Sequence, residues 1–96
     1  MVIGDYGYRK VIQLTGATAD DLSAIVSLRW VVARPDGTRF ERVLGNGDRD
    51  LNGNFTWLVQ PSDLTVSGHY SCQAIDVTTG RQIATFISRF RVDKLL

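Results

Sequence analysis

The fold is decided by the stretch LTVSGHYSCQA, residues 64 to 74. Gly68 is expected to open a β-strand there, because Tyr70, Cys72 and Ala74 follow at a period of two and therefore share one face. The residues between them are polar, so the other face of the strand is expected to meet solvent. The stretch therefore predicts a half-buried strand that is entered through a turn and points Tyr70 into a core.

The turn before this strand has a recognisable chemistry. Tyr70 stands two residues before Cys72 and follows the turn Asp63-Leu64, which resembles the tyrosine corner of immunoglobulin-like sandwiches. The resemblance implies that the ring packs in the core while the hydroxyl hydrogen-bonds to the turn backbone. Cys72 is the only cysteine, so no inter-sheet disulfide can form within the chain.

Strand periodicity extends in both directions from this centre. Six segments show it, and they are residues 8–15, 25–34, 39–44, 55–60, 69–77 and 82–93. Turn chemistry separates them, with Pro35 and Gly37 in one hairpin and Gly80 in another. Residues 16–21 are expected to form a turn and residues 45–54 an exposed loop, and no segment has the period of an amphipathic helix. The pattern predicts an all-β, immunoglobulin-like antiparallel sandwich of about seven strands.

The side chains expected to point inward are mostly large and apolar. Along three of the segments they are Val26, Leu28, Trp30 and Val32; Phe55, Trp57 and Val59; and Ala84, Phe86, Phe90 and Val92. Val31 and Thr56 are expected on the solvent side. Burial of each large side chain stabilises the fold by roughly 1.5 to 3 kcal/mol. The aromatic residues are therefore assigned to the core rather than to a platform for stacking carbohydrate.

The composition describes one small folded domain. Hydrophobic residues make up 44% of the 96 residues, which is enough for a single core. Lys and Arg exceed Asp and Glu by 11 to 10, and this balance gives no electrostatic case for binding nucleic acid or an acidic membrane. Transmembrane and signal-peptide patterns are not seen. A single cysteine favours folding in a reducing cytoplasm.

The order of several turn and core segments resembles one family. The segments are Asp21-Leu22-Ser23, Arg34-Pro35-Asp36-Gly37-Thr38, residues 63–70, Gln73-Ala74, and Thr85-Phe86 to Phe90-Arg91-Val92. Together they resemble the immunoglobulin-like domain of tailed-bacteriophage virion proteins and are similar to the N-terminal module of upper baseplate proteins. The resemblance covers residues 4 to 95 and implies a structural particle protein without a catalytic role. Upper baseplate proteins continue into a further region, so a stand-alone tail or capsid component is the other interpretation.

The function that this resemblance implies is assembly. One domain, residues 1–96, is expected to bind other virion proteins and copies of itself in a homo-oligomer, in the tail or baseplate rather than the head. Residues 1–7 are expected to form a loose docking arm. The interface candidates are Tyr6, Tyr8, Leu95 and Leu96. Capsid decoration and binding of a host-surface glycan through residues 45–54 are the alternatives.

One loop has the spacing of a calcium site. Asp48, Asp50 and Asn52 offer oxygen atoms at alternate positions, and Gly53 stands at the sixth position. The twelfth position, where a bidentate Glu is required, is Val59. The three residues are therefore a metal candidate whose alternative role is to support the turns of a polar loop.

No set of residues meets the requirements of an active site, so the protein is predicted not to be an enzyme and to need no cofactor. His69 is interpreted as a surface residue, because no Gly-x-Ser-x-Gly elbow accompanies it. Cys72 is expected to be a buried apolar side chain and not a nucleophile. Arginines between residues 29 and 49 are offset by acidic neighbours, which predicts a solvated, salt-bridged sheet face or a subunit interface. These arginines are Arg29, Arg34, Arg39, Arg42 and Arg49.

Overall fold

The structure is a computed structural model that describes residues 1–15, 19–85 and 88–94. The strands within these ranges are β1 (Arg9–Ile12), β2 (Leu28–Ala33), β3 (Arg39–Leu44), β4 (Phe55–Leu58), β5 (Gly68–Asp76), β6 (Gln82–Ile83) and β7 (Arg89–Val92). A short helix, α1 (Ala19–Ala24), precedes β2, and a 3-10 turn, η1 (Asn46–Asp48), follows β3. Phe86, which was expected in the core, and the interface candidates Leu95 and Leu96 lie outside the described residues.

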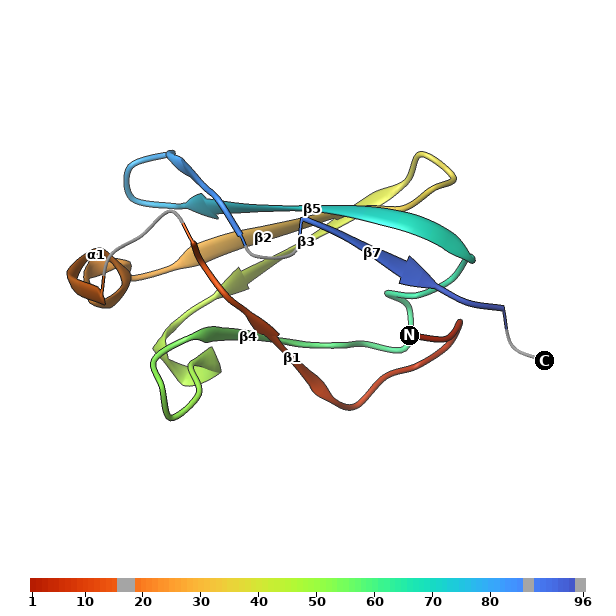
Figure 1. Ribbon diagram of the computed structural model, residues 1–96, viewed down its shortest axis with the longest axis horizontal. Coiled ribbons are helices and arrows are strands. Elements are labelled where there is room, and N and C mark those ends of the chain that lie inside the picture. Colours follow the sequence, from red (N-terminus) through yellow and green to blue (C-terminus); the bar gives the residue numbers. More distant parts are fainter. Residues whose placement is uncertain (16–18, 86–87, 95–96) are drawn as a thin grey trace.

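The strands form two antiparallel sheets that pack face to face (Figure 1). In the smaller sheet β1 pairs with β4, and in Figure 1 this pair lies below the larger sheet. The larger sheet has the order β3-β2-β5, and both β6 and β7 pair with the remaining edge of β5. The prediction of an all-β antiparallel sandwich of about seven strands without a disulfide is therefore confirmed.

Aromatic side chains fill the space between the two sheets. The ring centroid of Trp57, from β4, lies 6.2 Å from that of Trp30, 5.7 Å from that of Phe40 and 5.9 Å from that of Phe90. Phe90 also stacks on Tyr70 with 5.1 Å between centroids. The contacts of Trp57 thus reach β2, β3 and β7, and they confirm that these aromatic residues belong to the core.

Tyr70 makes the corner contact that the sequence predicts. Its side chain is fully buried, and its hydroxyl donates to the carbonyl of Val66 at 2.6 Å and accepts from the N–H of Val66 at 3.2 Å. Gly68, which opens β5, has a φ of +129°, and a Cβ atom there would lie only 2.9 Å from Cγ of Pro35. The corner therefore joins the start of β5 closely to the β2–β3 hairpin.

Replacing Tyr70 by phenylalanine is expected to lower the free energy of unfolding by about 1–3 kcal/mol, because both backbone groups of Val66 lose their hydrogen-bond partner. Urea denaturation monitored by tryptophan fluorescence measures the change. Tyr6→Phe is the matched control, since the side chain of Tyr6 is 63% exposed and its hydroxyl is free to bond water. A Y70F variant as stable as Y6F would contradict the corner's contribution to stability.

The prediction of one continuous strand over residues 82–93 is wrong. Ile83 in β6 and Phe90 in β7 both face the core, although they are an odd number of residues apart and strict alternation would place them on opposite faces. The chain leaves β5 between these strands, and the carbonyl of Ala84 accepts a hydrogen bond from the N–H of Thr15 at 2.8 Å. Ala84, which was expected to point inward, is exposed at this break. The break also explains why the inward residues are odd-numbered in β6 and even-numbered in β7.

Four local expectations are also corrected. Residues 19–24, part of which was expected in a turn, form α1. Val26 is 66% exposed because it precedes β2 and lies outside the pairing of that strand. Val31 is on the outer face, yet neighbouring rows of the sheet leave it only 8% exposed. Thr56 is 4% exposed because its hydroxyl donates to the carbonyl of Asp48 at 2.6 Å, which brings the η1 turn over it.

Residues 1–7 are bound to the domain, so the expectation that this segment is loose is wrong, while its role in docking stays a prediction. The N–H of Ile3 donates to the carbonyl of Asp93 at 3.1 Å, just after β7. The N–H of Gly7 donates to the carbonyl of Val59 at 2.9 Å, just after β4. The N-terminal segment therefore links the ends of strands from both sheets.

Candidate functional site

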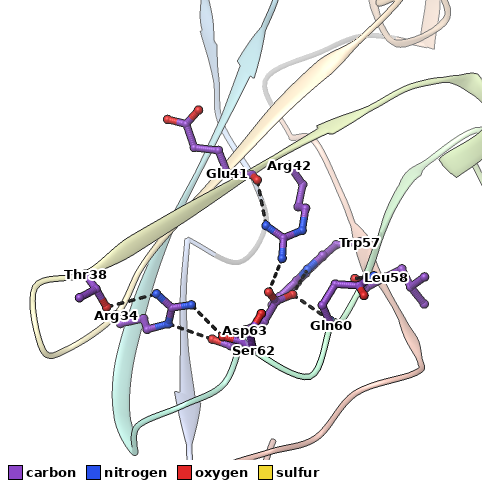
Figure 2. A network of polar contacts seen from close by, with 9 residues as sticks. All are labelled: Arg34, Thr38, Glu41, Arg42, Trp57, Leu58, Gln60, Ser62 and Asp63. Atoms are coloured by element: carbon purple, nitrogen blue, oxygen red, sulfur yellow. Dashed lines mark hydrogen bonds and ion pairs between the residues drawn. The ribbon is translucent and has the colours of Figure 1, made fainter.

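A charged group, the carboxylate of Asp63, is fully buried in the turn between β4 and β5 (Figure 2). One oxygen, Oδ2, accepts hydrogen bonds from Nε1 of Trp57 at 3.0 Å and from the N–H of Gln60 at 2.9 Å. The other oxygen forms an ion pair with the guanidinium of Arg42 from β3. Because each oxygen has a partner and none of the side chain is exposed, the carboxylate fastens the turn to both sheets and is not available to a substrate.

Two arginines that were expected on the solvated sheet face point instead toward this turn (Figure 2). Arg34 donates from Nε to the carbonyl of Asp63 at 3.0 Å and from Nη2 to the carbonyl of Ser62 at 2.9 Å. The guanidinium carbons of Arg34 and Arg42 lie 4.8 and 4.9 Å from the centroid of the Phe40 ring. These cation–π contacts and hydrogen bonds assign both arginines to the fold.

The loop of residues 45–54 is organised around Arg49. Its guanidinium donates to the carbonyl of Gly53 at 2.8 Å and to that of Leu22 at 3.1 Å, and it lies 4.1 Å from the centroid of the Phe55 ring. Arg49, like Arg34 and Arg42, therefore binds groups within the fold and does not belong to the predicted surface cluster. Sequence spacing alone could not reveal this, since Leu22 is distant in the chain.

The two acidic metal candidates have partners within the chain, and Oδ1 of Asp48 lies 3.3 Å from Nη1 of Arg9. Oδ2 of Asp48 accepts from the N–H of Gly45 at 3.0 Å. Oδ1 of Asp50 accepts from the N–H groups of Asn52 and Asn54 at 2.9 and 3.0 Å. Across the described residues, no three His, Cys, Asp or Glu side chains gather closely enough to hold a metal ion. The geometry fits the alternative role, in which these side chains support turns.

His69 and Cys72, the two residues with catalytic potential, lie on opposite faces of β5. His69 is exposed on the outer face, which confirms the prediction that it is a surface residue. Cys72 faces the core with 6% exposure, and this burial raises the pKa of its thiol to about 12. The prediction that Cys72 is a buried apolar side chain is confirmed, and the two groups cannot act on one substrate.

Replacing Cys72 by alanine is expected to make the free energy of unfolding depend less on pH in the alkaline range. The thiol ionises near pH 8.5 in the unfolded chain, roughly its ordinary pKa, but burial holds its pKa at about 12 in the folded protein. Between these values the unfolded state loses a proton that the folded state keeps, so stability falls by up to about 1.4 kcal/mol per pH unit as pH rises. Urea denaturation of both proteins from about pH 8 to pH 10 compares the slopes. Identical slopes would contradict burial of the thiol.

A cavity of about 150 Å³ opens between the sheets beside β1. Its largely apolar wall includes Ile12, Trp30, Trp57, Cys72 and Phe90. Nε1 of Trp30 is buried without a hydrogen-bond partner among the described residues. The wall also includes Lys10, Gln13 and Thr85. The thiol of Cys72 is held neutral by burial there and is therefore not an activated nucleophile.

The interface candidates that the structure describes are accessible. Tyr6 is 63% exposed and Tyr8 is 36% exposed, in the segment that leads into β1. Leu58 of β4 is 37% exposed and is paired with Arg9. It shares the outer side of the smaller sheet with Val11, which is 51% exposed, so this side also carries accessible aliphatic side chains that were not among the interface candidates.

The described surface contains open strand edges and a sheet face that carries charged and apolar side chains. Among the described residues, no helix has the length and apolar character to cross a membrane. Comparisons of the chain with protein-family models, with curated proteins and with solved structures found no match.

Proposed function

We propose that the protein is a structural subunit of a tailed-phage particle and acts through contacts with other proteins. The phage setting is supported by the resemblance of the ordered turn and core segments to the immunoglobulin-like domains of tailed-phage virion proteins. The mode of action is supported by one observation, the open edge of β3. This strand ends the larger sheet, with β2 on one side and no strand on the other among the described residues.

The open edge of β3 combines exposed backbone hydrogen-bonding groups with charged and apolar side chains, which favours pairing with a particular strand of another protein. All six residues of β3 pair with β2, so the opposite edge presents backbone N–H and C=O groups along the same length. The outward side chains are Arg39, Glu41 and Val43, and Val43 is 67% exposed. An added strand could bond this backbone and cover Val43, while the charges oppose indiscriminate association.

The experiment that tests the proposal is antibody-gold labelling of purified particles from the source phage, with mass spectrometry of the same particles. Label at the tail tip is the expected result. Label over the head would replace the tail assignment by capsid decoration. Absence of the protein from the particle would overturn the proposal.

The open-edge mechanism has its own test in phage that carry edge variants. Val43→Lys is expected to reduce incorporation into particles about tenfold, because a third charge on the exposed positions of β3 opposes pairing with a neighbouring strand. Val77→Lys is the matched control, since Val77 is 49% exposed just beyond β5. Equal incorporation of V43K and V77K would contradict the role of β3.

A further inference from the structure

We infer that the outer face of the larger sheet is a docking surface for an acidic protein. The exposed basic residues of this face, here called the basic face, are Arg29, Arg39, His69, Arg89 and Arg91. They come from β2, β3, β5 and β7, so the fold and not the sequence brings them together. The inference rests on the proposed function for the setting in which the partner is met.

Strand register places these residues on one side of the sheet. Arg39 is paired with Ala33, Ala33 with Ser71, and Ser71 with Arg89. Directly paired residues of antiparallel strands point to the same side, so this row carries an arginine at each end and two small side chains between them. At about 4.8 Å per strand, the backbones of Arg39 and Arg89 are roughly 14 Å apart.

The adjacent rows extend the same face. His69 is paired with Arg91, and these two residues line a shallow hollow together with Arg89 and Phe90. Arg29 lies two residues from Val31 along β2, which places it on the same side. The basic face therefore spans the sheet from β3 to β7 and contains a depression beside β7 that can receive a carboxylate side chain.

The charges of the basic face are largely uncompensated within the chain. Arg29, Arg39 and Arg89 make no side-chain hydrogen bond or ion pair with any described residue. Arg91 is paired with Asp93 at 3.0 Å, but the two side chains are 71% and 58% exposed, and such a surface pair contributes little. Carboxylates of an incoming partner can therefore pair with these three guanidinium groups without first breaking a contact within the described chain.

The prediction of a salt-bridged sheet face did not identify the unpaired arginines of the basic face. It counted Arg34, Arg42 and Arg49, which bind the turn and the loop described above. The partners of those three arginines include the carboxylate of Asp63 and backbone carbonyl groups, which are not the acidic neighbours that were expected to offset the arginines. What remains near β3 is Arg39 with Arg29, joined by arginines from the distant strand β7.

The composition of the face favours an acidic protein over nucleic acid. Glu41 lies on this face, where its carboxylate has no described side-chain partner and would repel a phosphate backbone. Val43 and Ile75 add aliphatic surface on either side of Arg29. Arginine mixed with apolar residues is typical of protein interfaces, and a partner with mostly acidic side chains plus one cation opposite Glu41 matches the pattern.

The test is an NMR titration of the purified, isotopically labelled protein with poly-L-glutamate of about 20 residues, which presents carboxylates on a peptide without phosphate. Amide resonances of β2, β5 and β7 are expected to shift most. Binding is expected to weaken about tenfold or more between low and high salt, because exposed charges are screened. Duplex DNA of about 20 base pairs is titrated in parallel.

Charge reversal locates the contact. The double variant R39E/R89E is expected to bind poly-glutamate at least about tenfold more weakly than the wild-type protein. The double variant K10E/K94E has the same change in net charge at two exposed lysines outside the basic face, and it is expected to keep nearly full affinity. Equal losses in both variants, no loss in R39E/R89E, or shifts confined to the smaller sheet would overturn the inference.

Preference for the DNA duplex over poly-glutamate would also overturn the inference and assign the face to nucleic acid. This test is separable from that of the proposed function. A protein that binds poly-glutamate through the basic face but is absent from particles keeps the inference and loses the proposed function. If the protein is found in particles but its basic face binds no acidic probe, the proposed function is kept and the inference is lost.

Discussion

Replacing Asp63 by alanine is expected to lower the free energy of unfolding by about 3–5 kcal/mol, a large part of the total stability of a small domain. The carboxylate is fully buried, and its loss leaves Nε1 of Trp57, the N–H of Gln60 and the guanidinium of Arg42 without their acceptor. Each of these donors then carries a desolvation cost that its hydrogen bond had offset. Urea denaturation monitored by far-UV circular dichroism measures the loss without relying on Trp57.

Two further variants serve as the fallback and the control for this prediction. Asp63→Asn preserves the shape and one acceptor oxygen but places an amide N–H among donors, so a loss of about 2–3 kcal/mol is expected. This variant supplies the measurement if D63A does not fold. Asp93→Ala removes a 58% exposed carboxylate and is expected to cost no more than about 0.5 kcal/mol. A loss in D63A as small as that in D93A would show that the Asp63 contacts do not stabilise the fold.

The sequence predicts the parts of this fold that depend on local periodicity. In the stretch 64–74 the spacing of Tyr70, Cys72 and Ala74 predicts one face of β5, and all three side chains are buried as expected. The Pro35–Gly37 hairpin is predicted equally well, because proline and glycine restrict the backbone by local sterics. These features require no knowledge of what lies across the sheet.

The parts that were missed depend on contacts between distant segments. Arg34 and Arg42 look like surface residues in the sequence, and only the position of Asp63 after β4 explains why they turn inward. The break between β6 and β7 follows from the hydrogen bond between Thr15 and Ala84, which no spacing within residues 82–93 reveals. Tertiary contacts override local patterns in both cases.

The calcium candidate and the basic face differ in how far apart their residues lie in the sequence. Asp48, Asp50 and Asn52 are close in sequence, so their pattern is visible at once. The carboxylates of Asp48 and Asp50 nevertheless bind the local backbone, and that of Asp48 also pairs with Arg9. Arg39 and Arg89 are far apart in sequence, so no motif links them, yet strand register brings them into one row. In a sandwich of short strands, cross-strand register therefore identifies surface sites better than sequence spacing does.

Replacing Trp57 by alanine is expected to lower the free energy of unfolding by about 3–5 kcal/mol and to loosen the smaller sheet first. A two-stranded sheet is marginal by itself, so β1 and β4 depend on packing against the larger sheet. Trp57 provides ring contacts to Trp30, Phe40 and Phe90, and its N–H donates to Asp63. Its removal both opens a cavity between the sheets and leaves the buried carboxylate with one donor fewer.

Hydrogen exchange distinguishes loosening of the smaller sheet from a uniform loss of stability. Amide exchange in β1 and β4 is expected to accelerate more than exchange in the β2–β5 pair, because β2 and β5 pair over six residues each in the middle of the larger sheet. Leu58→Ala, at the next position of β4, removes a 37% exposed side chain and is expected to cost less than about 1 kcal/mol. Trp57→Phe keeps a ring and supplies the exchange measurement if W57A is unfolded. Equal acceleration in both sheets would mean that Trp57 stabilises the sandwich as one cooperative unit and does not specifically dock β1 and β4.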